Sequence, residues 1–150
     1  MGNRISAADL GSGAGFPGLP IKLWAPSISM TLIEPNHKKA AFLREVTRAL
    51  SLTNIGVQTA RAESLAGVEY HLVTLRAVER FDKILPIARK LVAPGGRLAL
   101  LVGSEQLDRV RLLMPPLCWT QPEKIPLSRS RIFAVGHDER ARREDRSSLL

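Results

Sequence analysis

The chain lacks the features that would place a protein in a membrane or an oxidising compartment. None of its apolar runs approaches the roughly 20 residues that a bilayer-spanning helix requires, and its first residues show no signal-peptide pattern. Cys118 is the single cysteine, which excludes a disulfide framework and a metal site built from cysteines. The three histidines are scattered, with no metal-ligand spacing. These absences predict a cytoplasmic protein that holds no metal.

The charge of the chain is strongly positive. Lysine and arginine number 22 against 14 aspartate and glutamate residues, for a net charge of +8. Such a balance favours a polyanionic partner, with nucleic acid preferred. Because arginine is concentrated after residue 128, a basic tail that only aids solubility is the alternative. The length of 150 residues and the 45% hydrophobic content fit a single folded domain.

Short apolar runs alternate with segments of helical periodicity, which is typical of a parallel sheet covered by helices. The predicted strands span residues 5–10, 30–33, 55–59, 72–75, 98–102, 118–125 and 132–135. Helices are expected at 19–24, at 81–92 before the stop signal Pro94-Gly95-Gly96, and at 107–114. Another should begin after the N-cap Asn36 and bury Phe42, Leu43, Val46, Ala49 and Leu50. Together these elements predict a doubly wound α/β domain over residues 1–136, followed by a charged flexible tail over 137–150.

A glycine-rich turn follows the first predicted strand, with the sequence DLGSGAGFPG from Asp9 to Gly18. Gly11, Gly13 and Gly15 permit positive φ and let a ligand approach the backbone, and the next helix offers unpaired N–H groups. Gly13, Gly15 and Gly18 also fit the Gly-x-Gly-x-x-Gly spacing of dinucleotide-binding turns. The turn therefore predicts a nucleotide cofactor, either S-adenosylmethionine or a nicotinamide dinucleotide, and Asp9, Gly11, Gly13 and Gly15 are expected to contact it.

Polar residues end the neighbouring strands. Glu34 follows the second strand, where a carboxylate can accept hydrogen bonds from both ribose hydroxyls; the alternative is that it caps the next helix. Ala62 and Glu63 follow the third strand and could meet an adenine edge, unless they belong to an ordinary solvated loop. Arg76 ends the fourth strand, next to the point where open α/β sheets bind ligands.

Lys38 and Lys39 lie in the first turn of the helix that Asn36 begins. The helix macrodipole repels cations there by roughly 0.3–1 kcal/mol each. RNA phosphate could offset that cost, and so could the nearby carboxylate of Glu34.

The same stretches, taken together, resemble one protein family. They are DLGSGAGFPGLP at 9–20, LIE at 32–34, KKAAFL at 38–43, RAE at 61–63, VTLRA at 73–77 and PGG at 94–96. In these motifs the sequence is similar to the bacterial 16S ribosomal RNA guanine-N7 methyltransferases, the glucose-inhibited division protein B family, over about residues 5–136. The resemblance favours S-adenosylmethionine as the cofactor over NAD.

The resemblance implies a class I S-adenosylmethionine-dependent methyltransferase fold, Rossmann-like, with a seven-stranded mostly parallel sheet and helices on both faces. It implies that Gly11 and Phe16 line the cofactor site, that Ala62 and Glu63 contact the adenosine part, and that Arg76 completes the pocket. The implied reaction is methyl transfer to N7 of a guanine by a monomer whose partner is 16S ribosomal RNA or the 30S subunit.

Two further implications concern catalysis and RNA. Lys38 and Lys39 would face RNA. Guanine N7 has an available lone pair and needs no deprotonation, so no catalytic side chain is expected and positioning should suffice.

The sequence also departs from the family pattern. It begins almost at the first strand, without the family's N-terminal helical segment. His71, Leu75 and Val102 stand where the family usually has aspartate, serine and lysine. These differences favour, as an alternative function, a weak or inactive S-adenosylmethionine- or RNA-binding protein of the same family. An NAD-dependent oxidoreductase is a more distant alternative.

Overall fold

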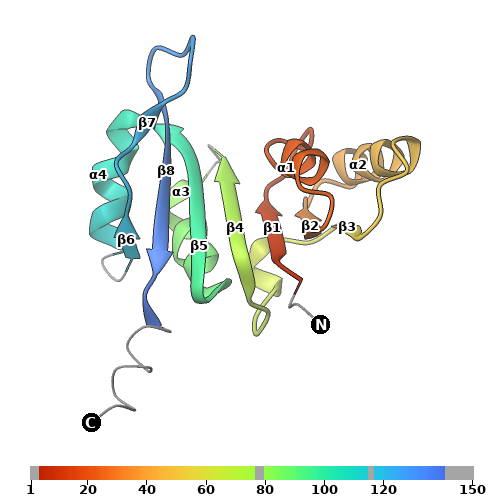
Figure 1. The fold of residues 1–150 in the computed structure, drawn as a ribbon, viewed down its shortest axis with the longest axis horizontal. Coiled ribbons are helices and arrows are strands. Elements are labelled where there is room, and N and C mark those ends of the chain that lie inside the picture. The colour runs from red at the N-terminus through yellow and green to blue at the C-terminus, as the bar shows by residue number, and fades with distance from the viewer. Residues whose placement is uncertain (1–3, 77–79, 115–116, 141–150) are drawn as a thin grey trace.

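The computed structural model describes residues 4–76, 80–114 and 117–140. They form one sheet with the strand order β3-β2-β1-β4-β5-β8-β6, and β7 pairs with β8 (Figure 1). The strands are β1 (Ser6–Leu10), β2 (Ser29–Ile33), β3 (Ile55–Gln58), β4 (Tyr70–Arg76), β5 (Val92–Gly103), β6 (Leu117–Trp119), β7 (Glu123–Lys124) and β8 (Arg131–Asp138). Strands β1 to β5 are parallel, whereas β6, β7 and β5 each run antiparallel to β8. The carboxyl ends of the five parallel strands therefore share one edge of the sheet.

Helices cover both faces of this sheet. They are α1 (Gly18–Trp24), α2 (His37–Ala49), α3 (Phe81–Lys90) and α4 (Ser104–Leu113), with a 3₁₀ turn η1 (Ala62–Ser64). Helices α1 and α2 pack on β2 and β3, and α3 and α4 pack on β5. Ala7 belongs to the core with α1 and α2, while the next residue, Ala8, belongs to the core with α3 and α4. Because neighbouring strand residues point to opposite faces, β1 is buried from both sides.

The expected α/β class is confirmed, with eight strands in place of the seven predicted. The segment expected as one strand over 118–125 forms two, β6 and β7. Pro122 lies between them and has no N–H to donate to the ladder, so pairing with β8 stops before it and resumes at Glu123.

Strand β5 also begins earlier than expected. The helix predicted to reach residue 92 ends at Lys90, because Val92 already pairs with Tyr70 in β4. The next pair along the ladder joins Leu72 to Arg97. The Pro94-Gly95-Gly96 stop signal therefore lies in a bulge of β5, where Gly95 has a φ of 73°.

The expected domain boundary at residue 136 falls inside β8, which continues through Asp138. The Asp138 carboxylate is buried and pairs with Arg89 at 2.9 Å and with Arg140 at 2.7 Å. These ion pairs join the end of β8 to Arg89 of α3 and to Arg140. Residues 141–150 of the expected tail lie outside the described residues.

Helix α2 begins as predicted but buries fewer residues. The Asn36 side chain accepts a hydrogen bond from the Lys39 N–H at 3.0 Å, so the N-cap is confirmed. Leu43 is buried, whereas Phe42 and Leu50, which were expected to share its face, are about half exposed. The helix lies over the short edge strand β3, which offers a narrow surface to pack against.

Candidate functional site

The glycine turn is shaped from inside by Asp9. This carboxylate is fully buried at the end of β1, and its Oδ2 accepts hydrogen bonds from Ser12 Oγ at 2.7 Å and Gly18 N at 3.1 Å. Its Oδ1 accepts from Thr74 Oγ1 of β4 at 2.7 Å. Burial raises the pKa of the Asp9 carboxyl, and these hydrogen bonds oppose the rise. Asp9 thus positions the turn and is not among the residues that line the pocket beside it.

The three glycines of the turn all have positive φ, 62° at Gly11, 60° at Gly13 and 100° at Gly15. Their surroundings differ. Gly15 is buried, and a Cβ on it would overlap the Leu19 side chain of α1. Gly11 and Gly13 are partly exposed and are the two that can meet a ligand.

Gly18 is required for a close approach between α1 and the sheet. A Cβ at this position would lie 2.5 Å from Leu32 Cδ2 and 2.7 Å from Asp9 Oδ2. Gly18→Ala is therefore expected to lower the free energy of unfolding by about 1–3 kcal/mol, the usual cost of overpacking. Urea denaturation measures this loss. Gly56→Ala is the matched control, because a Cβ there meets nothing within 4 Å; equal losses in the two variants would contradict the steric explanation.

Glu34 ties the turn to the neighbouring strand end. It is 5% exposed at the end of β2. Its Oε2 accepts from the Gly13 N–H at 2.8 Å, and its Oε1 accepts from the Asn36 N–H at 3.0 Å. Each carboxylate oxygen has a second lone pair, so both can accept a further hydrogen bond from a ligand.

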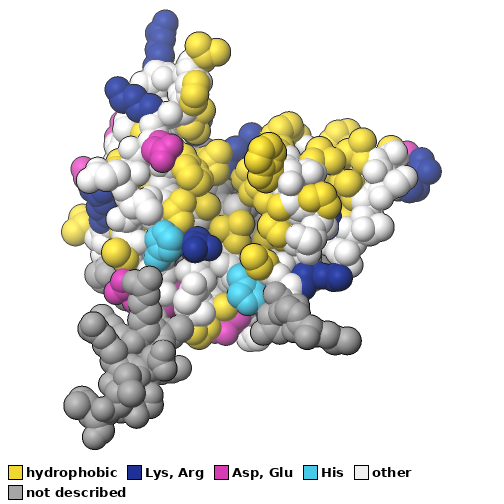
Figure 2. All heavy atoms as spheres, in the orientation of Figure 1, with side chains coloured by type: hydrophobic (Ala, Val, Ile, Leu, Met, Phe, Trp, Pro, Cys, Tyr) yellow, Lys and Arg dark blue, Asp and Glu magenta, His cyan; other side chains and the backbone are white. Residues whose placement is uncertain are grey.

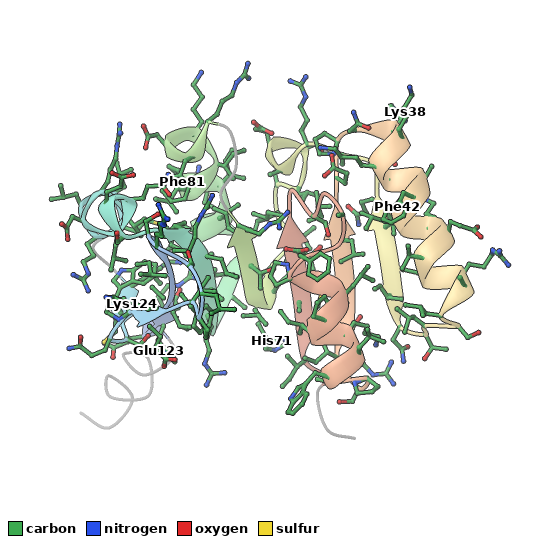
Figure 3. All side chains as sticks on the ribbon, turned by 90° about the horizontal axis from the view of Figure 1, so that it is seen from above. Lys38, Phe42, His71, Phe81, Glu123 and Lys124 are labelled. Atoms are coloured by element: carbon green, nitrogen blue, oxygen red, sulfur yellow. The ribbon has the colours of Figure 1, made fainter. Side chains whose placement is uncertain are left out.

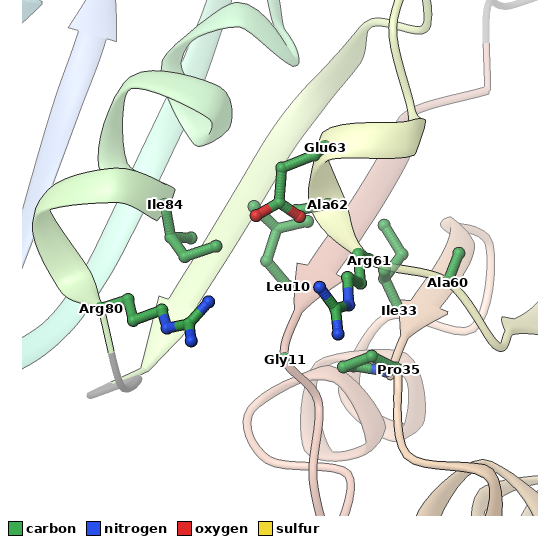
Figure 4. A pocket seen from close by; sticks show the side chains of 10 residues that line it. All are labelled: Leu10, Gly11, Ile33, Pro35, Ala60, Arg61, Ala62, Glu63, Arg80 and Ile84. Atoms are coloured by element: carbon green, nitrogen blue, oxygen red, sulfur yellow. The ribbon is translucent and has the colours of Figure 1, made fainter.

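A pocket of about 190 Å³ opens beside Glu34 (Figure 4). Its lining comes from the ends of β1 and β2, from η1 and from the start of α3: Leu10, Gly11, Ile33, Pro35, Ala60, Arg61, Ala62, Glu63, Arg80 and Ile84. Three of the expected site residues, Gly11, Ala62 and Glu63, therefore meet in one cavity. Aliphatic side chains form its walls, and the side chains of Arg61 and Arg80 extend toward the space between η1 and α3.

The sequence indicates some of the residues that line the pocket but not others. Leu10 and Ile33 are the last residues of β1 and β2, directly before Gly11 and Glu34, so their positions could have been inferred. Arg80 and Ile84 come from the start of α3. Nothing in the sequence indicates how that helix crosses the sheet, so these two residues were missed.

Other expected residues, Glu34 among them, are not part of this lining. Phe16 is about half exposed on the glycine turn. Arg76 lines a separate hollow with Leu101, Ile125 and Arg131, although its Nη2 lies 3.7 Å from where a Cβ on Gly13 would be. Arg76 therefore borders the glycine turn at Gly13 but does not line the pocket beside Glu34.

Lys38 and Lys39 are exposed in the first turn of α2, and Figure 3 shows Lys38 there. Within the described ranges, no ion pair joins either lysine to Glu34. Because the Glu34 carboxylate instead accepts from backbone N–H groups, it does not offset the unfavourable position of these cations by a direct contact.

The residues of the pocket fit an adenosine-containing cofactor. Leu10 and Ile33 provide apolar walls suited to a purine, Gly11 leaves backbone accessible, and the Glu63 carboxylate can accept hydrogen bonds from hydroxyl or amino groups. Glu34 is not in the lining, but its chain neighbours Ile33 and Pro35 are, and its carboxylate can accept further hydrogen bonds. Over residues 4–76, 80–114 and 117–140, no cluster of three or more histidine, cysteine or acidic side chains is placed to hold a metal ion. Nor is any helix in that part of the chain long and apolar enough to cross a membrane.

Solved structures share this architecture. P. horikoshii TYW2, in complex with MeSAdo, superposes with a TM-score of 0.75 at 14% identity over 90% of this chain and 57% of that one. A SAM-dependent methyltransferase from Aquifex aeolicus gives a TM-score of 0.72 at 14% identity over 89% of this chain and 81% of that one. These similarities confirm the class I methyltransferase fold.

Sequence relatives are closer. Ribosomal RNA small subunit methyltransferase G of Xylella fastidiosa is 41% identical over 72% of this chain and 51% of its own length. The proteins of the same description from Stenotrophomonas maltophilia and Halorhodospira halophila are 40% and 46% identical over 82% and 65% of this chain, and 58% and 46% of their own lengths. The chain thus spans about half the length of these curated relatives. The model of the GidB family, described as rRNA small subunit methyltransferase G, matches residues 1–121, and this chain belongs to that family.

Proposed function

We propose that the chain binds S-adenosylmethionine in the pocket beside Glu34 and transfers its methyl group to N7 of a guanine in small-subunit ribosomal RNA. One observation carries the proposal. In a chain of this methyltransferase family, a glycine turn anchored by Glu34 borders a pocket that Ala62 and Glu63 close from the next strand end. Family membership favours S-adenosylmethionine over NAD, which the turn's spacing alone leaves open.

The residues divide into those that hold the cofactor and those that shape its site. Gly11, Ala62 and Glu63 would contact the adenosine part, and Glu34 would accept the ribose hydroxyls. Asp9 and Gly15 act indirectly, because both are buried and fix the course of the turn.

The proposed reaction needs no side chain that acts as an acid or a base. Bound S-adenosylmethionine supplies an electrophilic methyl group. Guanine N7 already carries a lone pair, so no residue needs to remove a proton. The contribution of the protein is then to hold the two reactants in line, with the apolar walls around Leu10 and Ile84 excluding water.

Lys38 and Lys39 are proposed to contact RNA. They are exposed at the start of α2, where the helix macrodipole opposes a cation and a phosphate would compensate. The net charge of +8 supports a polyanionic partner. We expect a cytoplasmic monomer that acts on 16S ribosomal RNA or the 30S subunit without a metal.

Ligand-dependent thermal stability tests the cofactor assignment. S-adenosylmethionine at 100 times its dissociation constant should stabilise the chain by about 2.7 kcal/mol, and NAD at the same concentration should leave its melting temperature unchanged. Methyl transfer from labelled S-adenosylmethionine to undermodified 30S subunits tests the reaction. Stabilisation by NAD alone would overturn the cofactor assignment, and cofactor binding without transfer to 30S subunits would overturn the reaction.

A non-catalytic S-adenosylmethionine- or RNA-binding protein is the second candidate, favoured by the three departures from the family pattern. The structure gives each of these residues a packing or bonding role. Leu75 and Val102 are fully buried in β4 and β5, and His71 Nδ1 lies 2.9 Å from Ser6 Oγ at the amino end of the sheet. None of the three lines the pocket, so the departures do not by themselves exclude cofactor binding. The methyl-transfer assay therefore decides between a methyltransferase and a non-catalytic binding protein.

A further inference from the structure

We propose that the hairpin formed by β7 and β8 is an RNA-docking arm, in which Lys124, Arg129 and Arg131 bind phosphates of the substrate RNA. The inference rests on the proposed function and adds to it a second RNA-binding surface, on the opposite side of the cofactor pocket from Lys38 and Lys39.

The hairpin stands at the functional edge of the sheet. Arg131, the first residue of β8, pairs with Gly103, the last residue of β5. The connection over residues 125–130 therefore extends beyond the carboxyl end of β5. Figure 1 shows this hairpin rising above the edge toward which β1 and β4 point, the edge that carries the glycine turn.

Hydrogen bonds fix the conformation of the projecting loop. The Ser104 N–H, at the start of α4, donates to Ser130 O at 2.8 Å. Across the loop, Ile125 N donates to Arg131 O at 3.0 Å, and Ser128 N donates to Ile125 O at 3.1 Å. The backbone of the arm is thus a defined structure attached to α4.

The charges of the arm are unbalanced. Lys124, Arg129 and Arg131 are exposed, and Glu123 is the only acid from 117 to 137. In the part of the chain that the structure describes, none of these three cations forms an ion pair, whereas Arg89, Arg109 and Arg140 each pair with an aspartate. Figure 2 shows lysine or arginine side chains at the projecting end. Unpaired cations on an ordered projection suit phosphate ligands.

A hollow continues this basic surface toward the cofactor site. Arg131 and Ile125 of the arm line a space of about 380 Å³ with Arg76 and Leu101, and none of the described residues that line it is acidic. Arg76 borders the glycine turn at Gly13. Guanidinium groups match the bidentate geometry of phosphate oxygens, so a strand of RNA bound to the arm could continue to Arg76.

The tip of the arm adds an apolar side chain. Leu127 is fully exposed and has a φ of 62°, an uncommon conformation for leucine. Apolar side chains on nucleic-acid-binding proteins can insert between bases. Leu127 between flanking cations therefore suits contact with unstacked bases while the cations hold phosphates.

The two basic surfaces lie far apart across the molecule. Figure 3 shows Lys38 and Lys124 toward opposite ends of the sheet. The pocket beside Glu34 is formed by strand ends between them. RNA that contacts both surfaces would therefore cross the cofactor site.

Salt-dependent binding to a 16S ribosomal RNA transcript tests the arm. The double variant Arg129→Gln/Arg131→Gln should bind about ten-fold more weakly near 0.1 M salt. Its log–log salt slope should be shallower by roughly 0.7–0.9 for each phosphate that the protein no longer neutralises. Leu127→Gly, which accepts the positive φ, should weaken binding without changing that slope. The matched control is Arg48→Gln/Arg111→Gln, which removes the same charge from arginines already paired with Glu45 and Asp108.

Stabilisation by S-adenosylmethionine should be the same in all these variants, which shows that the fold and the cofactor site are intact. Equal affinity and slope in the arm variant and the control variant would overturn the proposal, as would a wild-type chain that binds no RNA. Arm-dependent RNA binding without methyl transfer would support the arm and refute the proposed reaction. Methyl transfer that is equally fast in the arm variants and the wild type would support the proposed reaction and refute the arm.

Discussion

Asp9→Ala is expected to lower the free energy of unfolding by about 2–6 kcal/mol, because it leaves two buried donors without an acceptor at roughly 1–3 kcal/mol each. These donors are the Ser12 hydroxyl and the Gly18 N–H; the Thr74 hydroxyl also loses its bond to Asp9 but keeps the Ala8 carbonyl oxygen at 3.4 Å. Urea denaturation followed by circular dichroism measures the loss. A loss below about 1 kcal/mol, the range of ordinary substitutions, would show that Asp9 does not organise the turn.

Asp9→Asn is the matched control and should cost much less. An amide oxygen can still accept from Ser12 and Gly18, and the amide N–H can donate to the Thr74 hydroxyl.

Burial raises the pKa of Asp9 above its usual value of 3.8. The stability that this group contributes is thus fully present below pH 3.8 and lost as the pH rises through its native pKa. The stability of Asp9→Asn relative to the wild type should therefore improve as the pH rises from about 3 to about 7, and the opposite trend would contradict the raised pKa.

Glu34→Ala is expected to weaken S-adenosylmethionine binding by about 100-fold or more, equivalent to roughly 2.7 kcal/mol. The substitution removes the proposed acceptor of the ribose hydroxyls. It also removes the carboxylate that fixes Gly13 and Asn36, and hydrogen bonds to a charged group contribute roughly 1.5–3 kcal/mol each. Isothermal titration calorimetry measures the change in affinity.

Glu63→Ala is the comparison for this measurement. Glu63 lines the same pocket but is exposed on η1, so its loss should weaken binding by less than about ten-fold, the effect of one ordinary hydrogen bond. Thermal unfolding separates weaker binding from disrupted structure in both variants. A folded Glu34→Ala chain with wild-type affinity would refute the proposed role of Glu34.

The two carboxylates of the site show what the sequence can predict. Glu34 was expected at a strand end near the glycine turn, and its carboxylate does contact Gly13 there. Asp9 was expected to contact the cofactor on the same reasoning, yet its side chain points inward to Thr74, 65 residues away along the chain. Strand periodicity locates a residue at the edge of the sheet, but the direction of its side chain depends on partners from distant strands.

The fold was predictable where burial dictates the pattern. The core strands of the parallel sheet are buried from both faces, and their apolar runs identified them. Predictions failed where a distant contact decides the outcome. The Asp138 ion pair with Arg89 extends β8, and the narrow contact of α2 with edge strand β3 leaves Phe42 exposed. Neither contact has a local signature in the sequence.

The bonds that hold the glycine turn have a consequence for the energetics of ligand binding. Asp9 fixes the turn from within the core, and Glu34 fixes it from β2. The protein itself therefore orders the backbone that is proposed to contact the cofactor, and binding there would not incur the entropy loss of organising a loop. The same preorganisation couples affinity to packing, because a substitution that loosens the β1–β2 pairing would move Gly13 relative to Glu34 and weaken binding without touching the ligand.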